Sequence, residues 1–335
     1  MDLPPILVEK LGADPLQCID VGARGGPQNH WRRFAAVMQT DLFEPDEVAC
    51  RQQAALKRPG ESWFPVALGG HTGNGKLHVL KQPSGSSLYP PNEPMLERFS
   101  PKSYWTLDRI ADVPLMTMSD FLDKYRRPLP NLIKLDVQGA ELDILKAARP
   151  EHWRNLLAVQ AEVEFVELYR GQPLFHDVDA FMRSQGFVMF DLLPVRYYRY
   201  DRDRPHGLMR RHLNILKNRR DISCRLVAGD AFFIRPPEDV VASGDVASAL
   251  KLFIILLVYR FLDEALWMAE ALQARGTVSP AEAAALIALV RSAAPRPRWV
   301  QRADGLGRLT RRVTRKLGIG RGRKIDYWLD RSWDF

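Results

Sequence analysis

Short apolar runs alternate with amphipathic stretches along the first two thirds of the chain. Runs of this kind are typical of strands buried on both faces of a parallel sheet. They lie at residues 16–21, 37–43, 63–68, 132–137, 156–163, 187–193 and 230–236. Helices are predicted between them, at 28–36, directly after Gly139 and at 176–185. This alternation of strand and helix predicts an α/β fold built on a doubly wound sheet.

Two further elements are predicted at the margins of this pattern. Residues 1–14 favour a short helix that ends near Gly12. The segment LHVLK at 77–81 favours an extra strand of a surface hairpin, placed after a GNG turn at 73–75.

From about residue 240 the pattern becomes Ala/Leu-rich and helical. Apolar residues at helical spacing predict one helix over 245–274, which Gly276 would end. Ser279, Pro280 and Glu282 provide an N-cap, a first-turn proline and a capping-box acid for a second helix that runs to about 293. We therefore predict a domain over 1–238, a helical hairpin extension over 239–294, and a basic, partly flexible tail over 295–335.

Composition is that of an ordinary globular protein. Hydrophobic residues make up 46% and charged residues 26% of the 335 residues, enough for a large core. The N-terminus lacks the features of a signal peptide, and the longest apolar run, at 252–259, is too short to span a bilayer. The three cysteines (Cys18, Cys50 and Cys224) fit no metal or redox spacing, which favours buried, reduced thiols. The sequence therefore predicts a cytoplasmic protein.

The net charge of +8 is concentrated in two segments. Residues 299–324 have a net charge of +8 and residues 194–225 a net charge of +7, so the rest of the chain is acidic. Arginine and tyrosine alternate over 195–220, a combination that suits phosphates, sugars or single-stranded nucleic acid, in a lid or acceptor loop. Apolar residues are interleaved with the cations of 299–324, which favours peripheral contact with an anionic membrane at its inner face. Nucleic acid is a less favoured partner, and solvated segments without a partner are the alternative for both regions.

The string IDVGARGG at 19–26 is the first candidate for ligand chemistry. A strand ends in Asp20, and Gly22, Gly25 and Gly26 follow before a predicted helix. Glycines at such a turn let the backbone bend sharply and let a ligand approach closely, while the helix N-terminus offers free N–H groups. The spacing differs from that of the dinucleotide fingerprint, and a purely structural turn is the alternative.

Two more strand ends carry acids. Glu44, in LFEPD, follows the second strand about twenty residues after the glycine turn, where a doubly wound fold binds the ribose hydroxyls of an adenosine. Asp136, in IKLDVQGAE, ends a later strand at the edge of the sheet that binds ligands. Lys134 alternates with Asp136 on one face, which allows an internal ion pair, and Glu141 is expected to cap the following helix. A capping or solvated acid is the alternative for Glu44.

Taken together and in this order, these strings resemble the FkbM methyltransferase family. The matching segments are IDVGARGG, FEP at 43–45, VALGG at 66–70, SSL at 86–88, KLDVQGAE at 134–141 and GDAFFIRP at 229–236. The resemblance covers about residues 16–236. The chain departs from the family pattern at Gln138, where the family more often has Glu, and in its helical and basic C-terminal part.

The resemblance implies a Rossmann-like, seven-stranded class I methyltransferase that uses S-adenosylmethionine. It places Asp20, Gly22, Ala23, Arg24 and Gly25 at the methionine part of the cofactor, Glu44 and Pro45 at the ribose, Ala67 and Leu68 at the adenine, and Asp136 beside the methyl group. A hydroxyl acceptor needs a base or a metal. The candidates for the base are Asp136 first, then Glu162, Glu164, His71 and His176. Carboxylates here could hold Mg²⁺, although no spacing in the sequence is diagnostic of a metal site.

Three functions follow from these interpretations. The first is O-methylation of a sugar, a glycan or another hydroxylated metabolite. The second is methylation of RNA through the segment 195–220, and the third is a binding or scaffold protein on the same fold without catalysis. The sequence identifies neither the acceptor nor the oligomeric state.

Overall fold

A seven-stranded sheet forms the centre of the computed structural model, which describes residues 3–56, 58–97, 105–198 and 225–294. Its strands are β1 (Leu16–Val21), β2 (Met38–Phe43), β3 (Glu61–Phe64), β7 (Leu132–Leu135), β8 (Ala158–Glu164), β9 (Val188–Tyr198) and β10 (Arg225–Ile234). They lie in the order β3-β2-β1-β7-β8-β10-β9, and β10 runs antiparallel to both of its neighbours. The doubly wound, Rossmann-like sheet predicted from the sequence is confirmed.

The chain reverses its direction of winding between β1 and β7. From β1 it builds outward to β2 and β3, and it then returns to place β7 on the other side of β1. Open α/β sheets bind ligands outside the carboxyl ends of the strands at such a switch point. The strand ends that carry Asp20 and Asp136 therefore meet at the position where this fold provides a crevice.

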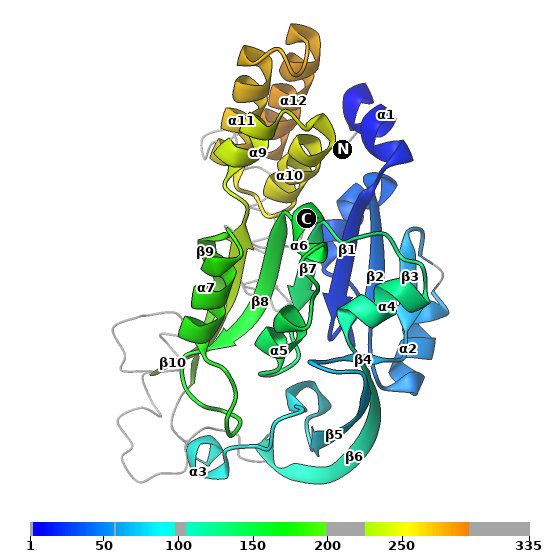
Figure 1. Cartoon of the computed structure of the whole chain (residues 1–335), viewed down its shortest axis with the longest axis vertical. Coiled ribbons are helices and arrows are strands. Elements are labelled where there is room, and N and C mark those ends of the chain that lie inside the picture. The colour runs from blue at the N-terminus through cyan, green and yellow to red at the C-terminus, as the bar shows by residue number, and fades with distance from the viewer. Residues whose placement is uncertain (1–2, 57, 98–104, 199–224, 295–335) are drawn as a thin grey trace, which may run out of the picture.

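A second, three-stranded sheet lies beyond the carboxyl ends of the main strands (Figure 1). It consists of β4 (Ala67–Leu68), β5 (Gly73–Leu80) and β6 (Leu107–Met116). The predicted single strand over 63–68 is wrong, because β3 and β4 belong to different sheets and Pro65 between them has no N–H to continue a ladder. The predicted GNG turn is also wrong, since Gly73 to Gly75 begin β5. The strand β6 was not predicted, because charged residues and a proline interrupt its apolar residues and half of its positions are exposed, so it lacks the pattern of a buried run.

Helices cover both faces of the main sheet (Figure 1). One face packs its apolar residues against α4 (Met118–Lys124), α5 (Glu141–Lys146) and α7 (Phe175–Ser184). The other packs against α1 (Pro5–Ala13), η1 (Asn29–Val37) and the C-terminal helices. The segment 28–36 was predicted as a helix and forms the 3₁₀-helix η1. The remaining short helices are α2 (Glu47–Ala54), η2 (Pro83–Gly85), α3 (Glu93–Leu96) and α6 (His152–Asn155).

Between β10 and residue 294, where the described part of the chain ends, lie the helices α9 (Pro237–Ser243), α10 (Val246–Val258), α11 (Leu262–Ala274) and α12 (Pro280–Ala293). The predicted continuous helix over 245–274 is wrong, because the chain breaks between α10 and α11, where Arg260 adopts a positive φ of 60°. Tertiary contacts hold this break. The Tyr259 hydroxyl donates to Gln160 Oε1 of β8 at 2.8 Å, and the Phe261 ring packs on Phe232 of β10. The predicted start of the last helix is confirmed, since Ser279 and Glu282 form a capping box.

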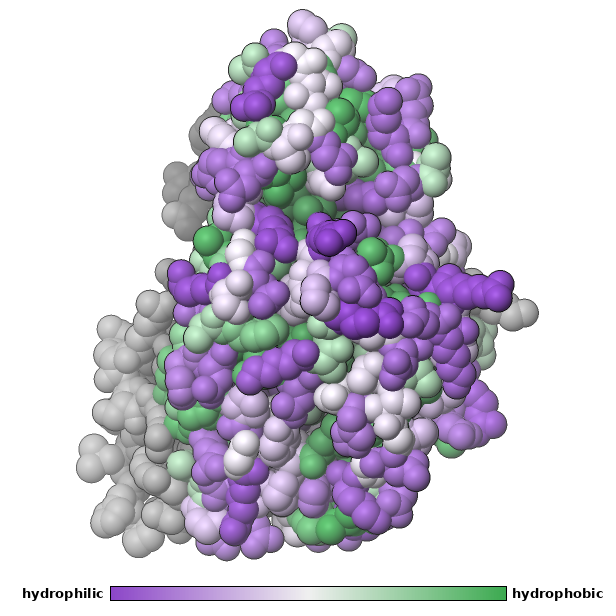
Figure 2. All heavy atoms as spheres, viewed as in Figure 1, coloured by the Kyte–Doolittle hydropathy of each residue, from purple (hydrophilic) through white to green (hydrophobic). Residues whose placement is uncertain are grey.

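The C-terminal helices and the sheet share one apolar core. Every residue of α10 from Ala249 to Val258 is buried, and this helix packs in the same cluster as the first residues of β1, β7 and β8. Figure 1 shows α9 to α12 beside α1, beyond the amino ends of the strands and opposite the small sheet. Figure 2, in the same view, shows a mostly hydrophilic surface, with hydrophobic residues visible at the end of the molecule where α9 to α12 lie. The proposed boundaries at 238 and 294 remain predictions.

Within the described ranges, every helix is too short or too polar to cross a bilayer. Cys18 and Cys50 are buried. Cys224, the greater part of the segment 195–220 and the whole tail 295–335 lie outside the described residues.

Candidate active site

A row of buried polar residues crosses the main sheet near its carboxyl edge. Asp20 of β1 lies beside Lys134 of β7, and Lys134 lies beside Gln160 of β8. The Lys134 ammonium is 3.3 Å from Asp20 Oδ1, and it is also 3.5 Å from Asp136 Oδ2, as the alternation of Lys134 and Asp136 predicted. Gln160 continues the row by donating to Asp230 of β10 at 3.0 Å.

Burial gives this row its electrostatic character. Asp20 is completely buried and Lys134 is 4% exposed. Burial raises the pKa of Asp20, and the neighbouring Lys134 opposes that rise. Burial also disfavours the charged lysine, but the carboxylates of Asp20, Asp136 and Asp230 together raise the pKa of Lys134 above its ordinary value. Lys134 is therefore a buried cation that fixes the two aspartates at the switch point.

The glycine turn after β1 joins the ends of three strands. The N–H groups of Gly22 and Ala23 donate to the Phe43 carbonyl of β2 at 3.1 and 3.0 Å, and the Asp136 N–H donates to Val21 at 3.1 Å. Gly22 has a φ of +83°, and a β-carbon there would collide with the Asp136 carbonyl oxygen. Only glycine fits this position. A β-carbon at Gly25, in contrast, would meet nothing within 4 Å, so the backbone there is open to a ligand.

Glu44 lies at the end of β2 with one carboxylate oxygen held. Its Oε1 accepts a hydrogen bond from the Asp46 N–H at 2.9 Å, and the Arg24 guanidinium lies 3.8 Å from that oxygen. Burial raises the pKa of Glu44, while the Asp46 N–H and Arg24 oppose the rise. None of the described residues donates a hydrogen bond to Oε2. The side chain is thus oriented and retains an acceptor for a ligand hydroxyl.

Gln138 connects the ends of β7 and β8. Its side-chain Nε2 donates to Asp136 Oδ1 at 3.1 Å and also to Glu162 Oε2. Its Oε1 accepts from the Tyr169 hydroxyl at 2.9 Å, and its carbonyl accepts from the Ser87 hydroxyl at 2.6 Å. Gln138 has a φ of +61°, a conformation that non-glycine residues adopt rarely and that clusters at functional sites.

Two more carboxylates lie behind this loop. Glu141 lies in the first turn of α5 and accepts hydrogen bonds from the Val137 and Gly139 N–H groups at 2.8 and 2.9 Å, so it caps the turn between β7 and α5 rather than the helix itself. Burial raises the pKa of Glu141 to about 7. Glu164 accepts from Gln172 Nε2 at 2.9 Å, and burial together with the charge of Glu141 raises its pKa well above the ordinary range.

The structure separates the predicted bases by exposure. The Asp136 side chain is 34% exposed at the edge of the sheet, whereas Glu162 and Glu164 are 3% and 2% exposed. His71 and His176 are exposed, and among the described residues no hydrogen bond or ion pair joins either histidine to these carboxylates. Among the three predicted carboxylate bases, Asp136 is therefore the most accessible to a substrate.

The predicted adenine residues lie in the small sheet. Ala67 and Leu68 form β4, which pairs in parallel with Leu115 and Met116 of β6. Leu68 is buried, while Ala67 is partly exposed. Pro45, beside Glu44, is also partly exposed.

Sequence reasoning missed the residues that link the strand ends. Gln138 was noted only as a departure from a family pattern, and the pairing of Lys134 with Asp20 was not predicted. The roles of Ser87 and Tyr169 depend on contacts 51 and 31 residues away along the chain. The SSL string drew attention to Ser87, but no local signal marks Tyr169.

The site offers carboxylates without a preformed metal centre. Within the part of the chain that the structure describes, no group of three or more His, Cys, Asp or Glu side chains is arranged to hold a metal ion. Lys134 and Gln138 already contact Asp136.

Strand order, switch point and the acids at the strand ends together define a Rossmann-like methyltransferase fold. The sequence profile of the Methyltransferase FkbM domain matches residues 20–189, half of the chain. The protein therefore belongs to the FkbM methyltransferase family. A comparison with curated proteins gives no significant match.

Proposed function

We propose that this methyltransferase uses S-adenosylmethionine to methylate a hydroxyl oxygen of a sugar, a glycan or another hydroxylated metabolite. The observation that carries the proposal is the convergence of Gly22, Glu44 and Asp136 at the switch point of a FkbM-family domain. The turn after β1, the oriented acid of β2 and the exposed acid of β7 meet at one edge of the sheet.

The residues present fit this cofactor. The open backbone at Gly25 leaves room for the methionine part of the cofactor. The partly exposed Arg24, which lies beside Glu44, is placed to bind the carboxylate of that methionine. The free Oε2 of Glu44 can accept a hydrogen bond from a ribose hydroxyl, in the position that doubly wound folds use for this purpose. The partly exposed Ala67 and Pro45 provide apolar surface for an adenine.

The cofactor would supply a methyl group that its sulfonium activates toward a nucleophile. The protein must hold the acceptor oxygen in line with that methyl group and accept the hydroxyl proton. Asp136 is suited to the second task because it is exposed and oriented by both Lys134 and Gln138. Glu162 supports this arrangement through Gln138, and the buried Glu164 lies behind it.

The hydroxyl acceptor follows from the family resemblance and from the basic segments, since arginine and lysine suit phosphates and sugars. The alternative of RNA methylation depends on 195–220, and the inner-membrane contact depends on 299–324. Both remain predictions, as does the cytoplasmic location.

Calorimetric titration of the full chain with S-adenosylmethionine tests the cofactor. We expect saturable binding to one site per chain, and a chain that binds no S-adenosylmethionine would overturn the proposal. Incubation of the protein with a cell extract and methyl-labelled cofactor tests the acceptor. We expect the label in saccharides or small hydroxylated metabolites; label in RNA would retain methyl transfer but replace the acceptor class.

A further inference from the structure

A pocket of about 480 Å³ lies beside the carboxylate site, between α5 and the small sheet. Ligand pockets in proteins range from about 300 to 1,000 Å³, so this one is large enough for a sugar ring with a substituent. Its polar lining comes from four elements that lie far apart in the sequence: the loop after β4, the strand β5, the segment after Ser87 and the helix α5. The residues that matter for recognition are His71, Lys76, Tyr89, Asp143 and Lys146.

Two glycines shape the walls. A β-carbon at Gly70 would lie 3.2 Å from Asp143 Cβ, and one at Gly75 would collide with the Leu115 side chain. Glycine at residue 70 lets the loop approach α5, and glycine at residue 75 makes room for the Leu115 side chain. Leu88 and Leu115 give the pocket an apolar surface.

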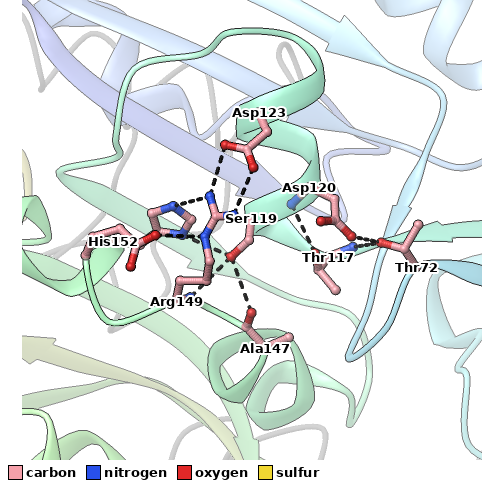
Figure 3. A network of polar contacts seen from close by, with 9 residues as sticks. Thr72, Thr117, Ser119, Asp120, Asp123, Ala147, Arg149 and His152 are labelled. Carbon is pink, nitrogen blue, oxygen red and sulfur yellow. Dashed lines mark hydrogen bonds and ion pairs between the residues drawn. The ribbon is translucent and has the colours of Figure 1, made fainter.

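A network of polar contacts fixes two of the walls through α4 (Figure 3). Thr72, next to His71 in the rim, donates to Asp120 and accepts from the Thr117 N–H at 3.1 Å. At the other wall, the Ser119 hydroxyl donates to the carbonyl of the lining residue Ala147 at 3.3 Å. The rim and the end of α5 are thereby attached to the same helix.

The same network includes an ion pair and a buried histidine. Arg149 donates to both carboxylate oxygens of Asp123 at 2.9 Å, and its N–H donates to Ser119 at 3.2 Å (Figure 3). His152 lies 3.1 Å from the Ser119 hydroxyl. Burial, followed by the Arg149 guanidinium, lowers the pKa of His152. Ser119 and His152 are both buried, and their contacts position the wall of the pocket.

The polar groups of the lining are complementary to a hydroxylated, anionic ligand. Lys146 is exposed. Lys76 forms an ion pair at 2.6 Å with Asp112, and both side chains are exposed. Because exposed ion pairs are weak, an anionic ligand can compete with Asp112 for Lys76. Asp143 accepts a hydrogen bond from the Tyr89 hydroxyl at 2.6 Å, so it is oriented and can accept from a ligand hydroxyl as well. Leu88, Leu115 and the Tyr89 ring suit the apolar C–H face of a sugar.

Hydrogen bonds through residues 87–89 connect the pocket to the carboxylate site. Ser87 donates to the Gln138 carbonyl at 2.6 Å and accepts from the Tyr89 N–H at 3.0 Å. The helix α5 begins at Glu141, which caps the Asp136–Gly139 turn, and continues to Asp143 and Lys146 in the pocket. Residues 87–89 and the start of α5 therefore connect the pocket to the turn that carries the proposed base, Asp136.

We infer that this pocket binds the part of the acceptor that carries a phosphate or carboxylate on a hydroxylated ring. Lys76 and Lys146 would bind the anion, Asp143 and Tyr89 the hydroxyl groups, and His71 the rim of the ring. This inference rests on the proposed function for its link to methyl transfer.

Calorimetric titration of the full chain with glucose 6-phosphate tests the inference, with glucose and inorganic phosphate as separate arms. We expect the sugar phosphate to bind at least fivefold more tightly than either fragment. Lys146→Gln and Asp143→Asn should each weaken that binding at least fivefold. Lys124→Gln, which removes an exposed lysine of α4 outside the pocket, should leave it unchanged.

Three results would overturn the inference: no binding of any probe at millimolar concentration, equal binding by the Lys146→Gln variant, or displacement of the sugar phosphate by S-adenosylhomocysteine. The last result would assign the pocket to the cofactor. Titration of every variant with S-adenosylmethionine separates the two proposals. Retained cofactor binding with no sugar phosphate binding removes only the pocket inference, whereas absent cofactor binding in the wild type removes the proposed function.

Discussion

Gly22 lies so close to Asp136 that a β-carbon on residue 22 would be only 2.1 Å from the Asp136 carbonyl oxygen. The contact fixes the end of β1 against the end of β7, and a backbone hydrogen bond from Asp136 to Val21 accompanies it. The two strand ends that the switch point brings together are thus in direct backbone contact, and the site depends on the absence of a side chain at residue 22.

We therefore expect Gly22→Ala to lower the free energy of unfolding by at least about 2 kcal/mol, because the substitution adds both a steric overlap and a strained positive φ. Urea denaturation followed by circular dichroism measures the change. Gly25→Ala is the matched control, since a β-carbon there meets nothing within 4 Å. It should keep the stability of the wild type and lose affinity for S-adenosylmethionine. Equal stability of the two variants would contradict the role given to Gly22.

Glu44→Gln should weaken S-adenosylmethionine binding roughly 10- to 100-fold, the loss expected for a hydrogen bond to a charged acceptor. The glutamine retains a carbonyl oxygen for the Asp46 N–H, so folding should change little. Isothermal titration calorimetry provides the affinity. Glu47→Gln, which alters the neighbouring exposed acid of α2, should bind as the wild type does. Unchanged affinity in Glu44→Gln would remove Glu44 from the ribose site.

Gln138→Glu would place a third carboxyl group between Asp136 and Glu162, where the glutamine amide now donates to both. We expect the new carboxyl group to retain a proton and its pKa to rise above the unfolded value. Its contribution to stability is then complete below the unfolded pKa and is lost as the pH rises through the folded pKa. The variant should be close to the wild type at pH 5 and clearly less stable at pH 8.

Urea denaturation at the two pH values measures this loss, and Gln52→Glu on the exposed face of α2 controls for the added charge. A pH dependence identical in the variant, the control and the wild type would show that Gln138 does not separate the two carboxylates.

Glu141 provides a second pH-dependent feature. Burial raises its pKa from an ordinary value of 4.5 to about 7, so its contribution to stability is complete below pH 4.5 and disappears as the pH rises through 7. Glu141→Gln keeps one acceptor for the Val137–Gly139 turn and cannot ionise. The free energy of unfolding of the variant minus that of the wild type should therefore be roughly 2–3 kcal/mol larger at pH 8 than at pH 4.5, which is the difference that the shifted pKa implies. A constant difference across this range would disprove the prediction.

Deletion of residues 299–335 should reduce binding to anionic phospholipid vesicles and leave binding to neutral vesicles unchanged. Nine cations lie within 299–324, and each one near an anionic surface contributes about 1 kcal/mol. Co-sedimentation with vesicles of either composition measures the partitioning. Equal partitioning of the deleted and full chains would discard the membrane prediction.

Strand ends were the most predictable part of this site. A run of apolar residues that stops at Asp20, Glu44 or Asp136 marks the end of a buried strand, and parallel strands present such ends at one edge. The alternation of Lys134 and Asp136 also predicted an ion pair that the structure contains. These features are local, because the period of a strand fixes which side chains share a face.

Failures occurred where distant contacts override the local pattern. Apolar spacing through residues 245–274 is continuous, yet Tyr259 and Phe261 pack on β8 and β10 and break the helix at Arg260. The apolar run at 63–68 is equally continuous, but its two ends pair with strands of different sheets. Pro65 is a local sign of the second interruption, whereas the first depends on contacts with strands about 30 to 100 residues away along the chain.

By itself, the sequence determined the α/β class, the glycine turn and the acids at the strand ends, since each depends on residues within a few positions of one another. Only the tertiary structure decided that Lys134 pairs with Asp20, that Gln138 connects Asp136 with Glu162, and that Asp136 is partly exposed while Glu162 is buried. These relationships join strands that are up to about 114 residues apart along the chain, and local periodicity carries no information about such pairings.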